Sequence, residues 1–264
     1  MVASHFLVTF ALSYHLMIKF LLSAFILMWA GSATAQNSKE PHGFAVVELF
    51  SSQGCGKSPA AENVIKLITD KAVAEGKQVI SLAYHVDYWN KYGWNDPYSD
   101  IRYTRRQSNY VSATSNDEVF TPQVFVNGAG GFVGSDKAKL NAEINKALKS
   151  SPKQTIALTH VSAVVNDTLT VGYAASKADR NSSLVIVISE NKTSTRITKG
   201  ENIGKTLEQE NVVRLLQIFP ISIAKGEIKF PVRKLKPGNG FRMVAYIQNK
   251  QTKKITAATQ YFFK

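Results

Sequence analysis

The pattern of hydrophobic and polar positions changes from mixed helix and strand to mainly strand near residue 150. The apolar run 46–50 predicts a strand, and positions 61–72 carry the i, i+3, i+4, i+7 spacing of an amphipathic helix. A second apolar run, 78–86, predicts a buried strand. A helix of this length between two strands indicates a parallel, right-handed crossover.

Three further elements are expected before residue 150. Asp96-Pro97 opens a polar helix that extends to about residue 113. Asn127-Gly128 between two apolar runs is a strong signal for a β-hairpin. Apolar positions within 138–148 predict a last helix, which Ser135 or Asp136 can cap.

Short strands with period-two alternation dominate the chain after a linker at Ser150-Ser151-Pro152. About seven such strands are expected, at the spacing of a β-sandwich. The pattern therefore predicts an α/β domain over residues 40–150 and a second, all-β domain over residues 153–264.

Residues 1–35 have the pattern of a signal peptide. Lys19 is the only charged residue among them, and the apolar run 20–30 and a small-x-small end at 33–35 follow it. The run is shorter than the ~20 residues that a membrane span needs, which disfavours the alternative of a membrane anchor. We expect an exported bacterial protein, periplasmic or secreted, that begins near Gln36 and keeps no membrane span after signal removal.

Composition narrows the classes of partner. The 264 residues include 32 Lys and Arg against 19 Asp and Glu, for a net charge of +13. The basic residues are scattered, without a long run or a nucleic-acid motif, so a basic solvated surface is expected and a nucleic-acid partner is not. Cys55 is the only cysteine, which excludes an internal disulfide.

Cys55 is the main candidate for chemistry. It follows a predicted strand and precedes a predicted helix, where unpaired amides and the helix dipole favour a thiolate. In this role Cys55 is a nucleophile, and Lys57 and the Ser58 hydroxyl would help to stabilise its charge. The alternative is a buried, inert cysteine left over from a degenerate site.

Several polar and aromatic residues are candidates for supporting roles. His85 and Asp87 flank the end of the second strand, at the same sheet edge as Cys55, and either could transfer protons during thiol exchange. They could instead be a core histidine and a loop or helix cap. Trp89 and Trp94 could form an apolar rim that binds a substrate, or could pack against the added helix.

Two more features have open interpretations, and one type of site is disfavoured. Arg102, Arg105 and Arg106 could bind a carboxylate such as that of glutathione, or form a solvated helix face. The polar segment 195–211 is long enough to reach over the first domain and shape access to the thiol, or is a simple loop. A metal site lacks enough soft ligands, so no metal or cofactor is expected.

The order of elements resembles the thioredoxin fold with an added helix. Thr121-Pro122 is similar to the cis-proline segment that lies against the active cysteine in that fold. The chain also resembles the exported thioredoxin-like family called domain of unknown function 1223. The motifs that carry this resemblance are Val47-Glu48-Leu49-Phe50-Ser51-Ser52-Gln53-Gly54-Cys55, His85-Val86-Asp87-Tyr88-Trp89, Gly93-Trp94, Arg106-Gln107, Thr121-Pro122-Gln123, Val126-Asn127-Gly128, Val133-Gly134-Ser135-Asp136, Gly200-Glu201-Asn202-Ile203-Gly204-Lys205-Thr206-Leu207 and Asn211-Val212-Val213.

The resemblance implies a thioredoxin-like α/β domain, followed by an all-β sandwich-like domain, with a thiol site at Cys55. Members usually carry Cys-x-x-Cys, whereas this chain has Cys55-Gly56-Lys57-Ser58. Ser58 cannot attack a mixed disulfide and release the partner, as a second thiolate would.

Two functions therefore remain. In the first, Cys55 forms mixed disulfides with a thiol-bearing protein or with glutathione, and an external thiol resolves them, an activity like that of a monothiol oxidoreductase. In the second, the protein is a non-enzymatic binding or accessory module in which Cys55 is dispensable. The sequence does not decide between them, and it does not indicate the oligomeric state.

Overall fold

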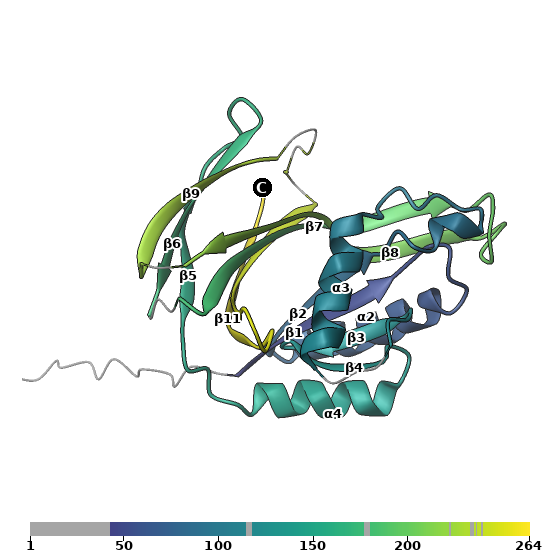
Figure 1. Cartoon of the computed structure of the whole chain (residues 1–264), viewed down its shortest axis with the longest axis horizontal. Coiled ribbons are helices and arrows are strands. Elements are labelled where there is room, and N and C mark those ends of the chain that lie inside the picture. The colour runs from purple at the N-terminus through teal and green to yellow at the C-terminus, as the bar shows by residue number, and fades with distance from the viewer. Residues whose placement is uncertain are drawn as a thin grey trace, which may run out of the picture. The chain divides into compact units, whose positions relative to one another are not determined.

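An eight-stranded mixed sheet runs through both halves of the chain (Figure 1). The computed structural model describes residues 43–114, 118–176, 180–221, 223–232, 235, 237, 238 and 240–264, so the predicted signal peptide lies outside the described residues. The strand order is β11-β10-β7-β8-β2-β1-β3-β4. The strands are β1 (Phe44–Ser51), β2 (Gln78–His85), β3 (Gln123–Val126), β4 (Ala129–Val133), β7 (Ser182–Arg196), β8 (Thr206–Pro220), β10 (Phe241–Asn249) and β11 (Ile255–Phe262).

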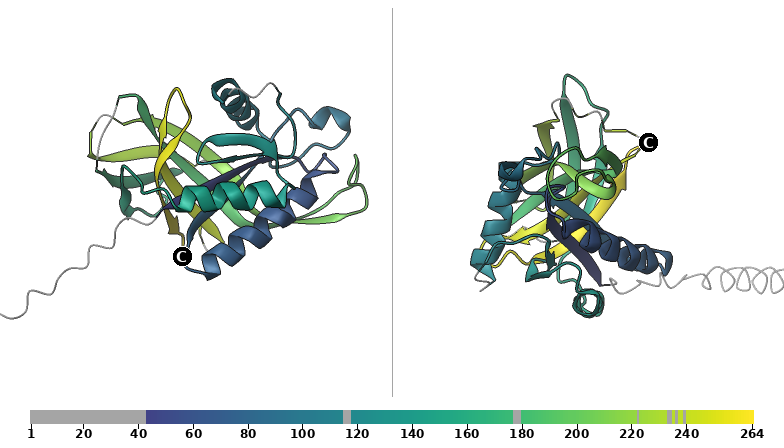
Figure 2. Two further views of the ribbon diagram at one scale, coloured as in Figure 1. Left: turned by 90° about the horizontal axis from the view of Figure 1, so that it is seen from below. Right: turned by 90° about the vertical axis from the view of Figure 1, so that its right-hand side faces the viewer.

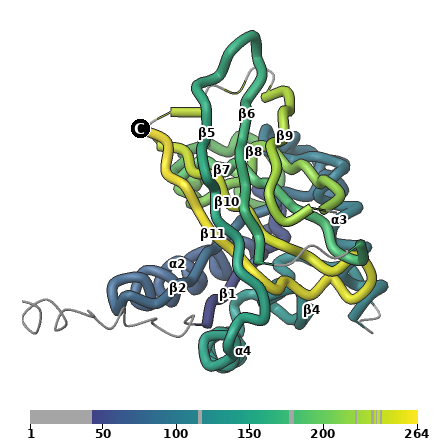
Figure 3. Tube along the Cα trace, turned by 90° about the vertical axis from the view of Figure 1, so that its left-hand side faces the viewer, coloured from purple at the N-terminus to yellow at the C-terminus, as the bar shows by residue number. Residues whose placement is uncertain are grey.

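A second, three-stranded sheet lies across one end of the large one. Its order is β5 (Ile156–Val161), β6 (Thr168–Ala175) and β9 (Lys225–Pro231). Figure 3 shows these strands in front of β7, β10 and β11. Leu169 and Val171 of β6 pack there against Ile186 of β7 and Ala245 of β10. The two β layers thus enclose one apolar core.

Three α-helices lie in the described residues: α2 (Ser58–Ala74), α3 (Ile101–Ala113) and α4 (Lys137–Leu148), with a short 3₁₀ turn, η1 (Asn90–Tyr92). Helices α2 and α4 lie side by side on one face of the sheet (Figure 2), where Ile65 and Leu140 pack against Leu49 of β1. Helix α3 covers the opposite face, where Tyr103 joins a core with Val46. None of these helices is long and apolar enough to cross a membrane within the described residues.

Several local predictions are confirmed. Strands β1 and β2 pair in parallel from Phe44 and Gln78 onward, as the crossover pattern predicts. Asn127 and Gly128 have φ angles of 48° and 80° and connect β3 to β4. A Cβ atom on Gly128 would lie 1.9 Å from the Lys253 carbonyl oxygen, so glycine is required there. The Asp136 side chain caps α4.

The polar helix begins later than predicted. Helix α3 begins at Ile101 with Asp100 as its cap, whose side chain accepts a hydrogen bond from the Arg102 amide. Asp96, at which the sequence pattern opens the helix, lies before it because its carboxylate accepts from the Gln53 amide and contacts His85.

The predicted division into domains 40–150 and 153–264 does not correspond to a break in the large sheet. The chain passes from α4 to β5 near this boundary, but β8 pairs in parallel with β2 at Val212 and Ala83. One apolar cluster also includes Tyr84 of β2 and Tyr246 of β10. The sequence pattern missed this because pairing between distant strands leaves no local signal.

A buried ion pair between β1 and α3 is hydrogen-bonded to β10, in the second half of the chain. Glu48 lies in the middle of β1 with no exposed surface, and Oε1 accepts from Nε and Nη2 of Arg106 on α3 at 3.0 and 2.8 Å. Tyr246 of β10 donates to the same oxygen at 3.1 Å, and Tyr110 donates to Oε2. Arg106 also donates to Oε1 of Gln248 on β10. Arg106 is therefore part of the core, which corrects its assignment to a carboxylate-binding or solvated helix face.

We predict that Arg106→Met lowers the free energy of unfolding by about 3–5 kcal/mol, because it leaves the Glu48 carboxylate buried without its counter-charge. Urea denaturation measures this change. Arg105→Met is the matched control, because it removes an exposed arginine from the same helix turn and should cost at most about 0.5 kcal/mol. Equal effects of the two substitutions would show that the ion pair is not what stabilises this core.

Candidate functional site

The turn between β1 and α2 folds on itself through short-range hydrogen bonds. The Cys55 amide donates to the Ser52 carbonyl at 3.1 Å, and the Gly54 amide donates to Ser52 Oγ at 3.0 Å. The Ser58 amide then donates to the Cys55 carbonyl at 3.2 Å, which leads into α2. Serine and glycine at these positions let the chain form a tight turn. Cys55 lies between the hydrogen bonds that close it.

The Cys55 side chain is buried against a second segment. Only 1% of Cys55 is exposed, and its Sγ lies 3.7 Å from the Thr121 carbonyl oxygen. The Thr121–Pro122 peptide bond is cis, as the resemblance implies. Trp89 donates from Nε1 to Thr121 Oγ1 at 2.6 Å. The structure therefore brings together four of the predicted site residues: Cys55, Thr121, Pro122 and Trp89.

Lys57 and Ser58 lie in different environments. Lys57 is exposed and makes no ion pair within the described part of the chain, so no contact ties its charge to the thiol. Ser58 is buried, and its Oγ accepts a hydrogen bond of 3.4 Å from the Ser52 amide. The serine hydroxyl thus helps to hold the turn.

The β7–β8 loop is hydrogen-bonded to this turn. Asn202 is fully buried and donates from Nδ2 to the carbonyl oxygens of Gln53 and Cys55, at 2.9 and 3.0 Å. The Gly56 amide donates to Glu201 Oε2 at 2.7 Å. Of the two interpretations of segment 195–211, these contacts favour the one in which it reaches over the first part of the chain. Because Glu201 accepts from the Gly56 amide, this amide is not available to a Cys55 thiolate.

Sequence reasoning did not assign a role to Glu201 or Asn202. Both lie in the motif Gly200-Glu201-Asn202, which resembles a family motif, and this was the one signal that pointed to them. Trp94 also contacts this region. It donates from Nε1 to Gln53 Oε1 at 3.1 Å, and its Cβ lies next to Gly200. Trp94 therefore packs between the turn and the loop.

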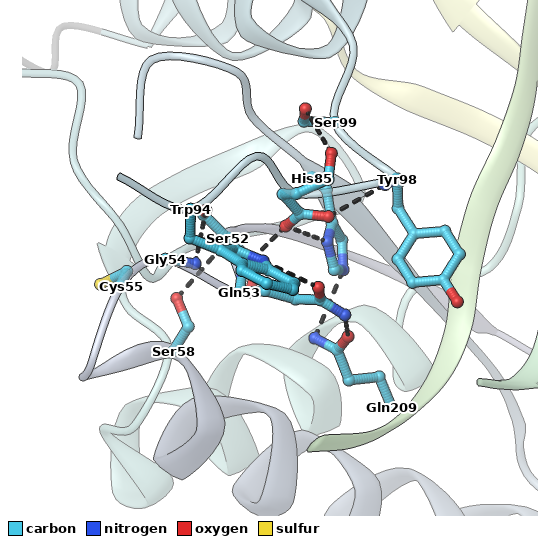
Figure 4. Close-up of polar contacts among 12 residues, drawn as sticks. Ser52, Gln53, Gly54, Cys55, Ser58, His85, Trp94, Tyr98, Ser99 and Gln209 are labelled. Carbon is cyan, nitrogen blue, oxygen red and sulfur yellow. Dashed lines mark hydrogen bonds and ion pairs between the residues drawn. The ribbon is translucent and has the colours of Figure 1, made fainter. Parts of the chain in front are cut away.

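His85 belongs to a buried network beneath the turn (Figure 4). Its Nδ1 lies 2.7 Å from Asp96 Oδ2, which also accepts from the Gln53 amide at 2.7 Å. On its other side, His85 Nε2 lies 3.5 Å from Nε2 of Gln209, which donates to Glu62 Oε1 at 2.8 Å. The Cys55 sulfur points away from the His85 ring in Figure 4.

Burial and neighbouring charges shift the pKa values of the side chains in this network. Burial favours neutral His85, but the charge and hydrogen bond of Asp96 outweigh it and raise the pKa of His85 above its usual value. Burial raises the pKa of Asp96, and the opposing effects of His85 and the backbone donors prevail and lower it. Burial raises the pKa of Glu62, which the His85 charge and the Ser51 and Gln209 hydrogen bonds only partly offset.

Asp87 has a structural role, because it binds Thr104 of α3. Its carboxylate accepts from Thr104 Oγ1 at 2.5 Å, and its amide donates to the same hydroxyl at 3.2 Å. Asp87 thereby joins the end of β2 to α3, in agreement with the loop or cap alternative. Among the described residues, no group of three or more His, Cys, Asp or Glu side chains is arranged to hold a metal ion.

We predict that the free energy of unfolding falls as the pH rises from 6 to 8.5. A raised pKa of His85 means that its stabilising effect is present below about 6.5, its usual value, and is lost as the pH rises through the pKa of the folded state. Urea unfolding at a series of pH values measures the slope. His85→Gln should remove most of it.

His160→Gln is the control, because His160 is half exposed and its Glu227 partner is similarly exposed. This variant should keep the slope of the wild-type protein. An unchanged slope in His85→Gln would contradict the assignment to the His85–Asp96 pair.

Comparisons with known proteins find one matching family model and solved structures of differing similarity. The family model described as "Protein of unknown function (DUF1223)" matches residues 46–248, whereas no curated protein matches the chain. An X-ray structure of a structural genomics target from Agrobacterium tumefaciens is similar with a TM-score of 0.61 and 22% identity, covering 83% of this chain and 94% of that one. A domain of the outer membrane lipoprotein Omp28 from Porphyromonas gingivalis gives a TM-score of 0.27 and 10% identity, over 44% and 91%. The family match spans most of the chain, including the Cys55 turn, His85, the Thr121–Pro122 segment and the β7–β8 loop, and the protein therefore belongs to the DUF1223 family.

Proposed function

We propose that this is an exported thioredoxin-like protein that forms mixed disulfides through Cys55, and that the β7–β8 loop controls access to the thiol. The main supporting observation is the position of Cys55. It lies after a central strand, at the start of α2, with Sγ 3.7 Å from the Thr121 carbonyl oxygen. The signal-peptide pattern of residues 1–35 supports export.

The proposed reaction is thiol–disulfide exchange with an external disulfide. The Cys55 thiolate attacks one sulfur of the disulfide, so that a Cys55–partner disulfide forms and the other half leaves as a thiolate that takes up a proton. The disulfide is therefore the oxidant, and an external thiolate reverses the step. Ser58 has no sulfur and cannot resolve the mixed disulfide within the chain.

The supporting residues have roles other than proton transfer. His85 and Asp96 hold the turn from below through the Gln53 amide, and no hydrogen bond joins either of them to Cys55 in the described structure. Trp89 positions Thr121, which would present its backbone to a partner bound at Cys55. Asn202 and Glu201 hold the loop closed over the turn.

Two observations favour a second function. Cys55 is only 1% exposed, and the nearby Gly56 amide is already paired with Glu201. These are features of a degenerate site in a non-enzymatic binding module. The two functions differ in whether the loop opens to expose the sulfur.

We predict that Asn202→Ala speeds the alkylation of Cys55 by iodoacetamide tenfold or more. The substitution leaves two buried carbonyl oxygens without their donor, which should favour release of the loop. Because Cys55 is the only cysteine, mass spectrometry of the intact protein reports its rate directly. Lys199→Ala, an exposed position in the same loop, should leave the rate unchanged. Equal rates in both variants would exclude the loop as the barrier.

We also predict that oxidised glutathione adds one glutathione to Cys55, that reduced glutathione removes it, and that Cys55→Ala takes up none. Ser58→Cys should gain glutathione-dependent exchange with a peptide disulfide, since it restores a resolving thiol. Ser150→Cys is the control, because it adds an exposed cysteine at the end of α4. No adduct in wild type or Asn202→Ala, together with no gain in Ser58→Cys, would refute the redox function and leave the binding module.

A further inference from the structure

A basic pocket lies beside α3 and shares no lining residue with the Cys55 turn. It has a volume of about 240 Å³ and is bounded by α3, β8, β10 and the turn after β10. Its cationic lining residues are Arg102, Arg105, Arg106 and Lys253, and its apolar ones are Leu216 and Ile218. No acidic side chain lines it within the described residues.

Two of the four cationic side chains are already neutralised. Arg102 pairs with Asp100 at 2.6 Å, and Arg106 pairs with the buried Glu48 at 2.8 Å. Arg105 and Lys253 have no carboxylate partner in the part of the chain that the structure describes. The pocket therefore keeps two uncompensated positive charges.

The surroundings of Lys253 disfavour its positive charge. Lys253 is half-buried in the turn between β10 and β11, where its Nζ donates to the Lys250 carbonyl oxygen at 2.5 Å. Burial lowers the pKa of Lys253, and the positive charge of Arg106 lowers it further. An anion held between Lys253 and Arg105 would offset both effects and would form charge-assisted hydrogen bonds.

The remaining wall suits an apolar group. Leu216 and Ile218 lie two residues apart on β8, and Leu216 is buried whereas Ile218 has 55% of its surface exposed. Cations at one side and an exposed aliphatic surface at the other would match a molecule that has a charged end and an apolar body.

We propose that this pocket binds a small amphipathic anion, in which a carboxylate or a phosphate is joined to an alkyl or similar apolar body. Arg105 and Lys253 bind the anionic group, and Leu216 and Ile218 contact the apolar body. This site is independent of thiol chemistry at Cys55, and its test does not depend on the outcome of the glutathione experiments.

Isothermal titration of the purified protein with octanoate, octyl phosphate, acetate and inorganic phosphate tests the proposal. We expect saturable binding of at least one octyl compound, at least tenfold tighter than its short counterpart. Comparison of octanoate with octyl phosphate shows whether the site prefers a carboxylate or a phosphate. Higher salt should weaken binding, because the charged contacts are near the surface.

Arg105→Gln and Lys253→Gln should each weaken this binding about tenfold or more, the typical effect of losing a charge-assisted hydrogen bond. Lys71→Gln is the control: it removes one positive charge from an exposed position on α2 and should leave binding unchanged. Circular dichroism verifies folding, and Arg105→Glu provides a second, exposed variant that reverses the charge. Absence of saturable binding, or equal losses in Lys71→Gln and the pocket variants, would overturn the proposal.

Discussion

The buried Glu48–Arg106 pair is the interaction on which the rest of the structure depends. A carboxylate in the centre of β1 is tolerated only with its counter-charge and hydrogen-bond donors in place, because an unpaired buried charge costs several kcal/mol. Those partners come from α3 and β10, which are far apart in the sequence. The pair therefore fixes α3 on one face of the sheet, and its hydrogen bonds with Tyr246 and Gln248 couple the first half of the chain to β10. The Cys55 turn begins where β1 ends, so this core also sets its position.

The site above that core is a polar assembly from three distant segments. Gln53 contributes from the turn, Asp96 from the segment after β2, and Gln209 from β8. Each of these side chains satisfies a buried group of another segment, which explains why polar residues can fill the space beneath the thiol without large cost. Cys55 is buried separately, with its sulfur against the Thr121 segment. Because only 1% of Cys55 is exposed, chemistry at the sulfur requires local opening, and within the proposed function the β7–β8 loop is the segment that opens.

The sequence predicts the local elements well because they follow from periodicity and turn chemistry. The parallel crossover, the Asn127–Gly128 hairpin and the cap of α4 are all of this kind, and the contact of Cys55 with Thr121 follows from the resemblance to the thioredoxin fold. The roles of Arg106 and Gln209 could not be predicted, since each depends on partners over 50 residues away. Asp96 illustrates the limit: before a proline it has the local features of a helix start, yet buried partners bind its carboxylate first.

Electrostatics at the start of α2 links access to the thiol with its activation. A helix N-terminus favours one negative charge nearby, and Glu201 occupies that position through the Gly56 amide. A Cys55 thiolate would compete with the Glu201 carboxylate for the same amide and would be repelled by it. Within the proposed function, withdrawal of the loop therefore has two effects at once, because it uncovers the sulfur and frees the Gly56 amide beside it. A thiol without a resolving cysteine is trapped by any disulfide it forms, so a loop that keeps it covered would limit such reactions to a partner able to displace the loop.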